Sequence, residues 1–401
     1  MITIHLKPHK EESLWRFHPW VFSGAIRSIQ LDADYPYDQP KEGALVTVVD
    51  SRGQVMGVGH YQIGSIAVRM LEFGVEELSR NFWRDRIAAA YSVRVSLGLI
   101  NEQNNTYRLI HGEGDFLPGL IVDIYADTAV VQAHSIGMHC HRQEIAQAIV
   151  DVVEQVDKVY YKSDDTLPHK APIEGERVGY LLGANSDEEV FWAKENGLNF
   201  RIDWLRGQKT GFFIDQRDNR ALLEHYAKGK EVLNMFCYTG GFSVYALRGG
   251  AKRVHSVDVS QKAVDLVRSN VAYNFGEDAP HEAFAKEAFE FMSQNTNTYD
   301  LIILDPPAFA KHRDAVKNAL RGYQRLNAKG IQCIRPGGIL FTFSCSQAID
   351  KDMFRLAVFS AAAQVGRKVR ILHQLHQPAD HPINIYHPEG EYLKGLVLQV
   401  E

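Results

Sequence analysis

The sequence predicts a multidomain protein with a small all-β barrel, a middle α+β domain and a C-terminal doubly wound α/β domain. Three observations lead to this prediction. Residues 1–74 hold short alternating apolar runs broken by glycine, as strands and tight turns require. Residues 75–190 mix helical and strand patterns. Over residues 191–401 strands alternate with helices, which favours a mostly parallel sheet covered on both faces.

The composition is that of an ordinary globular protein of 401 residues, with 45% hydrophobic residues, 23% charged residues and a net charge of −5. No apolar run reaches the ~18 residues of a membrane span, and the first residues hold no apolar segment of signal-peptide length. We therefore expect a cytoplasmic protein that has no membrane partner. The four cysteines form no CxxC pair, which argues against a zinc site and against a disulfide framework.

Turn signals and periodicity define the elements of the first two domains. The sequence DSRG at 50–53 predicts a hairpin turn in the first domain. In the middle domain we expect a helix over 75–99 that begins at a Ser cap and a hairpin over 117–135 that turns at Ala126 and Asp127. A second helix over 138–156 and a strand over 157–163 should follow. The acidic, turn-rich stretch 183–200 marks the next boundary.

The third domain alternates strands with helices. We expect its strands over 230–237, 251–260, 299–307 and 337–346. A helix should follow the first strand over 243–250, and another should begin at a Ser260 cap and cover 261–275.

A strongly basic helix is expected within 306–335, a stretch that holds seven Lys or Arg and one acid, Asp314. Lys317, Arg321, Arg325 and Lys329 recur every four residues, and apolar residues occupy the opposite side. A solvated face would explain most such charge runs. Here almost no acid balances the stripe, so a polyanionic partner is an equally good interpretation.

Polar signals stand where three successive strands of the third domain end. Gly240 and Gly241 follow the first strand, and Asp258 ends the next one, where a carboxylate can bind the two ribose hydroxyls of an adenosine. Asp305 ends the third strand and precedes two prolines that fix the backbone. Ligands bind at the carboxyl ends of such strands. The G-x-G-x-x-G fingerprint is absent, which disfavours a nicotinamide cofactor.

At these motifs the chain resembles the class I S-adenosylmethionine-dependent methyltransferases. It resembles more closely the ribosomal RNA large-subunit 5-methylcytosine methyltransferase family, over nearly its whole length, at RFHPWVFSGAI (16–26), GEGDFLPGLIVDIYAD (112–127), QKTGFFIDQRDNR (208–220), LDPPAFAK (304–311), SCS (344–346) and EGEYLKGLVLQ (389–399). The resemblance implies an N-terminal PUA domain, which is a small RNA-binding β-barrel, and a Rossmann-like catalytic domain. It also implies S-adenosylmethionine as cofactor, S-adenosylhomocysteine as product, no metal, and large-subunit ribosomal RNA as partner.

The resemblance also implies a cofactor site. Asn234 stands where the superfamily has an acid, and Tyr238 replaces its first glycine. Glu287 would take the place of the acid that binds the adenine amino group, although an exposed helix glutamate fits nearly as well. The segment before the first strand would cover the cofactor; alternatively, Asp215 caps a helix whose Arg217 and Arg220 face water. The implied cofactor-binding residues are Phe213, Asp215, Gln216, Arg217, Asn234, Phe236, Tyr238, Thr239, Gly240, Gly241, Asp258, Val259, Glu287, Ala288 and Asp305.

Cys345 ends the strand that follows the basic helix, and we expect it beside Asp305 at the rim of the sheet. Ring carbon 5 of a pyrimidine is not nucleophilic enough to be methylated unaided, but a thiolate that adds to carbon 6 activates it. Asp305 would bind N3 or the amino group and help to protonate N3. Cys345 and Asp305 are therefore the predicted catalytic residues. The alternative for Cys345 is a packed core thiol.

The mechanism requires a low thiol pKa, which Ser344, Ser346, nearby basic residues and the positively charged cofactor could supply. Cys237 is expected against the cofactor, and Cys140 and Cys333 are expected in the core. Many 5-methylcytosine enzymes carry a second cysteine after the fourth-motif proline, but Pro307 and Ala308 stand there in this chain.

The predicted partner is RNA with a flipped or unpaired cytosine. Phe309 is a candidate stacking platform or a core residue, and a homodimer is one of the assemblies we consider. The residues predicted to bind RNA are Arg16, Lys311, Arg313, Lys317, Arg321 and Arg325.

Two other functions fit parts of the pattern. Asp-Pro-Pro followed by an aromatic residue also suits methylation of an exocyclic amino group on guanine or adenine, which needs no thiol. A non-catalytic RNA-binding or ribosome assembly protein with a vestigial cofactor fold is the second alternative, and the intact strand-end signals argue against it.

Overall fold

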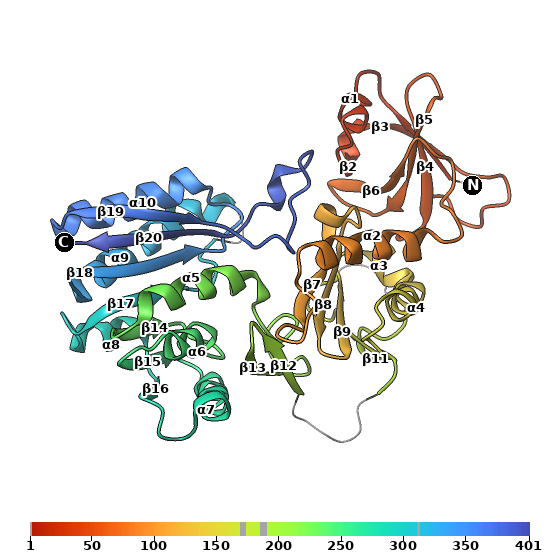
Figure 1. Cartoon of the computed structure of the whole chain (residues 1–401). Coiled ribbons are helices and arrows are strands. Elements are labelled where there is room, and N and C mark those ends of the chain that lie inside the picture. Colours follow the sequence, from red (N-terminus) through yellow and green to blue (C-terminus); the bar gives the residue numbers. More distant parts are fainter. Residues whose placement is uncertain (1, 169–173, 185–190, 311–312) are drawn as a thin grey trace. The chain divides into compact units, whose positions relative to one another are not determined.

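The computed structural model describes residues 2–168, 174–184, 191–310 and 313–401 (Figure 1). The chain forms two compact units, and each unit is built from separate segments. Unit 1 comprises Met1–Glu189, Asp203–Gly211 and Ala379–Gly390, and unit 2 comprises Val190–Ile202, Phe212–Pro378 and Glu391–Glu401.

The first domain in unit 1 is a six-stranded sheet with the order β2-β6-β5-β4-β1-β3. Its elements are β1 (Thr3–Leu6), α1 (Glu12–Trp15), β2 (Trp20–Phe22), β3 (Ile26–Gln30), β4 (Leu45–Val49), β5 (Val55–Tyr61) and β6 (Ile66–Phe73). The predicted hairpin turn between β4 and β5 is confirmed. The Asp50 carboxylate closes it by accepting hydrogen bonds from the backbone N–H groups of Arg52 and Gln54, each 2.8 Å long.

Unit 1 also contains a five-stranded sheet with the order β11-β10-β9-β8-β7. Its elements are α2 (Phe82–Ser96), β7 (Thr106–His111), β8 (Leu120–Tyr125), β9 (Thr128–Ala133), α3 (Ile136–Cys140), α4 (Arg142–Val152), β10 (Lys158–Lys162) and β11 (Val178–Leu182). The hairpin over β8 and β9 is confirmed, and its turn residue Ala126 has φ of 54°. The predicted Ser cap of α2 is wrong, because the Ser79 carbonyl accepts from Phe82 N–H in a preceding turn and Asn81 is the N-cap.

Two segments from the C-terminal half of the sequence complete unit 1. Thr210 donates to the Asp123 carboxylate at 2.6 Å. The Arg94 guanidinium, which is fully buried, donates to the Asp380 carbonyl at 2.7 Å, and the Asp380 carboxylate accepts from Arg108 N–H at 3.0 Å. These contacts add to the ion pairs that Arg94 forms with Asp115 and Asp123 forms with Arg108, so these buried polar groups obtain part of their hydrogen bonding from residues remote in sequence.

Unit 2 contains the doubly wound sheet, which has seven strands in the order β16-β15-β14-β17-β18-β20-β19. The strands are β14 (Glu231–Met235), β15 (Arg253–Asp258), β16 (His281–Ala285), β17 (Tyr299–Leu304), β18 (Ile334–Ser344), β19 (Val369–Leu375) and β20 (Lys394–Val400). The helices are α5 (Arg217–Ala227), α6 (Gly241–Arg248), α7 (Gln261–Phe275), α8 (Ala288–Gln294), α9 (Val316–Cys333) and α10 (Lys351–Val365). The predicted Ser260 cap of α7 is confirmed, since its hydroxyl accepts from Ala263 N–H.

Alternate residues of the central strands enter two separate hydrophobic layers, as the period of two in a strand requires. Leu233, Ile302 and Leu340 pack in one layer with residues of α8, α9 and α10. Their chain neighbours Val232 and Ile303 pack in the other layer with residues of α5 and α6. The sheet is therefore covered on both faces by hydrophobic layers.

Strand register aligns the carboxyl ends of the parallel strands in unit 2. Met235 of β14 lies opposite Val257 of β15 and Leu304 of β17, and Leu304 lies opposite Thr342 of β18. Residues that follow these positions consequently share one edge of the sheet, where ligands bind in open α/β folds.

A short hairpin precedes this sheet in unit 2, formed by β12 (Phe191–Glu195) and β13 (Leu198–Ile202). Glu195, which is fully buried, accepts two hydrogen bonds from Arg220 of α5, 3.0 and 2.7 Å long. The same carboxylate accepts from the Tyr245 hydroxyl at 2.9 Å. The hairpin is thus fixed to α5 by a buried, hydrogen-bonded ion pair.

We predict that Glu195→Ala lowers the free energy of unfolding by about 3–5 kcal/mol, because it leaves the Arg220 guanidinium charged, buried and without its partner. Urea unfolding of the full chain measures this difference. Asp265→Ala, which removes an exposed ion pair with Arg268, is the matched control and should cost at most about 1 kcal/mol. Equal losses in the two variants would contradict the proposed importance of burial.

Candidate active site

The turn after β14 has an unusual backbone conformation. Phe236, Tyr238 and Gly240 have φ values of 58°, 46° and 80°. Bulky residues rarely adopt positive φ, so two of them in one turn indicate a constrained, functional loop. Tyr238, which the sequence presented as a departure from glycine, keeps the left-handed conformation that glycine favours. Thr239, the remaining predicted residue of this turn, is buried.

The two glycines of this turn are also needed for close packing. A Cβ atom at Gly240 would lie 2.8 Å from Val267 of α7, and one at Gly241 would lie 2.9 Å from Arg220 of α5. The start of α6 is therefore packed against its neighbours with no room for side chains at either glycine.

Asp258, at the end of β15, lies beside this turn. One carboxylate oxygen accepts from Tyr238 N–H and the other from Ser260 N–H, both at 3.0 Å. Each oxygen retains a second lone pair, so the same carboxylate can still accept from hydroxyl groups of a ligand.

Residues 212–220 contact two of the predicted strand-end residues, Tyr238 and Asp305. Phe213 and Tyr238 form an edge-to-face pair with ring centroids 5.1 Å apart. Gln216 donates to the Asp305 carboxylate at 3.1 Å. Arg217 and Arg220 are each only 2% exposed, so the alternative in which they face water is wrong. The segment thus lies along the carboxyl edge of the sheet in unit 2.

Asp215 does not cap α5. One of its carboxylate oxygens accepts from the Tyr392 hydroxyl at 2.7 Å. The other oxygen is buried and has no hydrogen-bond partner among the residues that the structure describes. A buried carboxylate oxygen without a donor is costly, and a cationic or N–H group of a ligand would satisfy it. Tyr392 was not identified from the sequence, because nothing local in EGEYLKG relates it to Asp215.

Asn234 provides a second acceptor of this kind. Its side-chain N–H donates to Ser243 at 2.9 Å, whereas its buried side-chain oxygen has no partner within the described part of the chain. An amide at this position offers an acceptor without adding a negative charge.

The remaining predicted cofactor residues follow β15 and β16. Val259 is 73% exposed although it is apolar, as expected for a residue that covers a flat ligand. Glu287 is exposed, and its carboxylate caps α8 by accepting from Glu290 N–H at 2.9 Å. Ala288 is buried beneath this cap. Glu287 therefore has a structural role that the sequence did not reveal, and its role toward a cofactor stays a prediction.

The predicted catalytic pair stands on neighbouring strand ends. Burial, and then the carboxylate of Asp215, raises the pKa of Asp305 to about 7. Cys345 is partly exposed. Burial, and then the carboxylates of Asp305 and Asp215, raises the pKa of the Cys345 thiol to about 12. The sulfur and both carboxyl groups therefore lie close enough to influence each other, and the acidic surroundings disfavour the thiolate.

The serines beside Cys345 hold its loop in place. Ser346, which is fully buried, accepts from Ala310 N–H at 3.3 Å and shares a 2.9 Å hydrogen bond with the Tyr323 hydroxyl. The Ser344 hydroxyl accepts from Ser346 N–H at 3.4 Å. The sequence SCS thus supplies one partly accessible sulfur between two anchoring hydroxyls.

The other cysteines are distinct from Cys345. Cys237 and Cys333 are buried, as is usual for free cysteine. Cys140 is exposed, so the prediction that it lies in the core is wrong: it is the last residue of the short helix α3, where the chain turns at the surface.

Three of the four basic residues predicted on the exposed face of α9 are exposed, and the fourth, Lys329, is half-buried. Lys317, Arg321 and Arg325 are exposed, whereas Tyr323 and Leu326 on the opposite side are fully buried. Arg325 also lies over the Phe289 ring, 5.5 Å from its centroid. Arg313 lies in a short 3-10 helix, Arg313–Ala315, and Lys311 lies outside the described residues.

Phe309 packs on α9, with its ring 4.6 Å from that of Tyr323. A Cβ atom at Gly322 would lie 2.9 Å from the Phe309 ring. These contacts favour the core interpretation over a free stacking platform.

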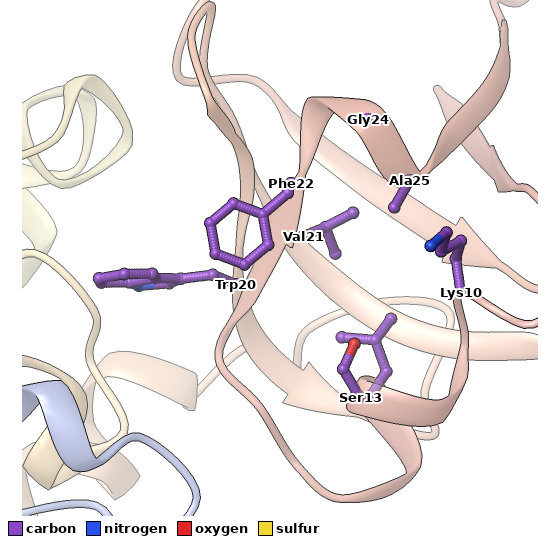
Figure 2. Close-up of a pocket in the computed structure, with 8 residues that line it drawn as sticks. Lys10, Ser13, Trp20, Val21, Phe22, Gly24 and Ala25 are labelled. Atoms are coloured by element: carbon purple, nitrogen blue, oxygen red, sulfur yellow. The ribbon is translucent and has the colours of Figure 1, made fainter.

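Arg16 lies in the N-terminal domain, where its guanidinium is exposed and pairs with Glu12 at 3.3 Å. The N-terminal domain also contains a pocket of about 340 Å³, lined by Lys10, Trp20 and Phe22 among other residues (Figure 2). The Trp20 indole donates to the Glu113 carboxylate at 2.9 Å, so this side chain has a structural contact within unit 1. Arg16 remains a predicted RNA contact.

We predict that Asp305→Asn removes a pH dependence of stability. The pKa of Asp305 is about 7 in the folded protein, whereas carboxyls in unfolded chains have a pKa near 4. Between about pH 4 and pH 7 the native state therefore binds one proton more at this group than the unfolded state does. This group therefore lowers the free energy of unfolding as pH rises toward 7, by at most about 1.4 kcal/mol per pH unit.

Urea unfolding of both proteins between pH 5 and pH 8 measures this effect. Asp305→Asn should gain stability over the wild type as pH rises to about 7, and the gain should then level off. Asp352→Asn, which changes a carboxyl with 88% side-chain exposure, is the control. A gain that does not vary with pH would contradict the raised pKa.

Among the described residues no helix is long and apolar enough to cross a membrane. The same part of the chain shows no cluster of three or more His, Cys, Asp or Glu side chains arranged to hold a metal ion.

Comparison with known proteins identifies the family. Residues 175–390 match the S-adenosylmethionine-dependent methyltransferase family model, and residues 4–73 match a PUA-like domain. A protein of Alteromonas mediterranea named ribosomal RNA large subunit methyltransferase I is 41% identical, with 98% of each chain covered. A protein of the same name from Tolumonas auensis is 38% identical, with 99% of each chain covered.

Solved structures show the same fold. A proposed SAM-dependent methyltransferase of Streptococcus mutans matches with a TM-score of 0.81 at 22% identity, over 100% of both chains. A proposed methyltransferase in complex with S-adenosylhomocysteine matches with a TM-score of 0.83 at 23% identity, also over 100% of both chains. The chain therefore belongs to the S-adenosylmethionine-dependent methyltransferase family, in the branch of the ribosomal RNA large subunit methyltransferase I proteins that carry an N-terminal PUA-like domain.

Proposed function

We propose that this protein methylates carbon 5 of a cytosine in large-subunit ribosomal RNA, with Cys345 as nucleophile. The observation that carries the proposal is the proximity of a partly accessible thiol and a carboxyl with a raised pKa, Cys345 and Asp305, at the edge of the sheet where such folds bind ligands. The relatives named ribosomal RNA large subunit methyltransferase I support this substrate. Action on ribosomal RNA in turn agrees with the expected cytoplasmic location.

The residues at this edge fit S-adenosylmethionine. The free oxygens of Asp215 and Asn234 would accept from the ammonium group of its amino acid part. Asp258 would accept from the ribose hydroxyls, and Val259 would cover the adenine. When bound, S-adenosylmethionine supplies an electrophilic methyl group and a positive charge close to the Cys345 sulfur.

The protein's own residues prepare the base for methylation. The Cys345 thiolate adds to carbon 6 of the flipped cytosine, and carbon 5 becomes the nucleophile that takes up the methyl group. The carbon 5 proton is then lost to a base, the carbon–sulfur bond breaks, and the thiolate is released. A protonated Asp305 can donate to N3 while negative charge develops on the ring, and its pKa of about 7 allows this near neutral pH.

The same arrangement explains why the thiolate is disfavoured before ligands bind. Burial and two carboxylates raise the pKa of Cys345. A cationic cofactor bound at this edge would offset part of this negative charge and lower that pKa. The thiol would therefore become reactive mainly in the loaded enzyme, which limits side reactions of the free protein.

RNA binding is assigned to the exposed basic face of α9. Lys317 and Arg321 would bind phosphates, whose neutralisation releases counterions and makes the affinity depend on salt. The N-terminal domain, with Arg16, would add further affinity. The domain boundaries near residues 74 and 190 and the homodimer stay predictions.

We predict that Cys345→Ala lowers methyl transfer to large-subunit ribosomal RNA by about a thousandfold or more, as expected when an essential nucleophile is removed. Calorimetry should show that S-adenosylmethionine still binds, with an affinity within about threefold of the wild type. Cys140→Ala, which changes an exposed cysteine, should keep full activity.

The other outcomes of this experiment identify the rival functions. Full methyl transfer by Cys345→Ala would favour an exocyclic amino group as the target, and mass mapping of the methylated nucleoside would show which base is modified. Failure of the wild type to bind millimolar S-adenosylmethionine would favour a non-catalytic RNA-binding protein.

We also predict that Arg321→Ala reduces the slope of log affinity against log salt concentration by about 0.7–0.9 for each phosphate that the variant no longer neutralises. Filter binding of a large-subunit ribosomal RNA fragment at several salt concentrations measures the slope. Arg355→Ala on α10, which removes another exposed arginine, should leave it unchanged. The α9 assignment would be wrong if both variants gave the wild-type slope.

A further inference from the structure

Lys394 is a buried lysine for which the proposed function has no role so far. It begins β20 and pairs in register with Ser344, the residue before Cys345. Only 4% of Lys394 is exposed. Its Nζ donates to the backbone carbonyl of Ser346 at 2.7 Å and to that of Tyr392 at 2.6 Å. The ammonium group is thus held by the loop that carries the Cys345 sulfur.

Buried lysines are rare and are normally paired with a carboxylate. The two groups that accept from Lys394 are neutral carbonyls, so they fix its position without neutralising its charge. An ammonium group has three protons to donate, and two are used here. Burial lowers the pKa of Lys394 to about 8, while Cys345, Glu391 and Asp350 act in the opposite direction.

The two nearby carboxylates are engaged by other groups. Glu391 pairs with Lys351 at 2.7 Å. Asp350 caps α10, where it accepts from Met353 N–H at 2.8 Å. Asp305 and Asp215 raise the pKa of Cys345, whereas Lys394 lowers it. Lys394 is therefore the cation, among the described neighbours of the sulfur, that opposes these two carboxylates.

We propose that Lys394 is a positioning residue that holds a fixed positive charge beside Cys345 and thereby stabilises its thiolate. This inference rests on the proposed role of Cys345 as nucleophile. In the activating step the S–H bond breaks, the proton passes to solvent, and the electron pair stays on sulfur beside the ammonium group. The same hydrogen bonds orient the Ser344–Ser346 loop, so charge and position are supplied by one side chain.

Three variants of the full chain separate charge from anchoring. Lys394→Gln retains N–H donors for the two carbonyls but has no charge. Lys394→Met removes both the donors and the charge. Lys394→Arg retains the charge. Lys368→Met, which changes an exposed lysine, is the matched control.

The main measurement is the rate of Cys345 alkylation by iodoacetamide between pH 6 and pH 10, read from the modified peptide by mass spectrometry. Lys394→Gln and Lys394→Met should slow alkylation about tenfold at pH 7, where Lys394, whose pKa is about 8, still carries its charge. Lys394→Arg should stay near the wild type, and Lys368→Met should equal it. Methyl transfer should fall in kcat by a similar factor in the uncharged variants, with the KM for S-adenosylmethionine unchanged.

Each other result overturns the inference. Unchanged alkylation in folded Lys394→Gln would show that the charge does not act on the sulfur. If both uncharged variants fail to fold while Lys394→Arg folds, the charge serves the fold and the positioning role is rejected. The alkylation rate is measured independently of methyl transfer. The role of Lys394 can therefore be refuted while the loss of activity in Cys345→Ala still supports Cys345 as the nucleophile. Conversely, an active Cys345→Ala would refute the nucleophile whatever the alkylation result.

Discussion

The register of the parallel strands is the constraint on which the site depends. Leu304 lies opposite both Met235 and Thr342, so β14 and β17 end at one level of the sheet, and the neighbouring strand β18 continues to Ser344. A shift of one residue in any of these strands would turn its apolar side chains to the wrong layer, which the two separate cores prevent. The packing of the sheet thus determines where Asp305 and Cys345 can stand.

The electrostatics of the site follow from this placement. The carboxylates of Asp215 and Asp305 are brought to the same edge. They create an acidic surrounding that suits a cationic cofactor and opposes a free thiolate at Cys345. The antiparallel strand β20 brings Lys394 to the strand that ends in Cys345. Reactivity at Cys345 is therefore set by a balance between groups from different strands rather than by its immediate sequence.

Much of this architecture could be predicted from the sequence because it depends on local patterns. Alternating strands and helices, the Ser260 cap and the polar residues at strand ends each leave a signal within a few residues. The start of α2 was misplaced because Ser79 and Asn81 are both plausible caps, and only the backbone turn decides between them.

The contacts missed from the sequence involve residues distant along the chain. The pairing of Glu195 with Arg220 depends on how the β12–β13 hairpin docks on α5. The contact of Tyr392 with Asp215 joins residues 177 positions apart. The sequence around Lys394 has no feature that sets it apart from an exposed strand lysine, and only its pairing with Ser344 places it near Cys345. Such contacts have no spacing signal because tertiary packing alone creates them.

The interleaved segments of the two units affect how the chain can fold during synthesis. Arg94 pairs with Asp115 and Asp123 pairs with Arg108, but Arg94 also donates to the carbonyl of Asp380 and Asp123 also accepts from the hydroxyl of Thr210, and these two groups are made after residue 189. A ribosome that has just released the first 189 residues has therefore supplied these ion pairs but not the last hydrogen bonds of this core. Unit 1 can reach its final hydrogen bonding only after residue 390 has emerged, when nearly all of unit 2 has been translated as well.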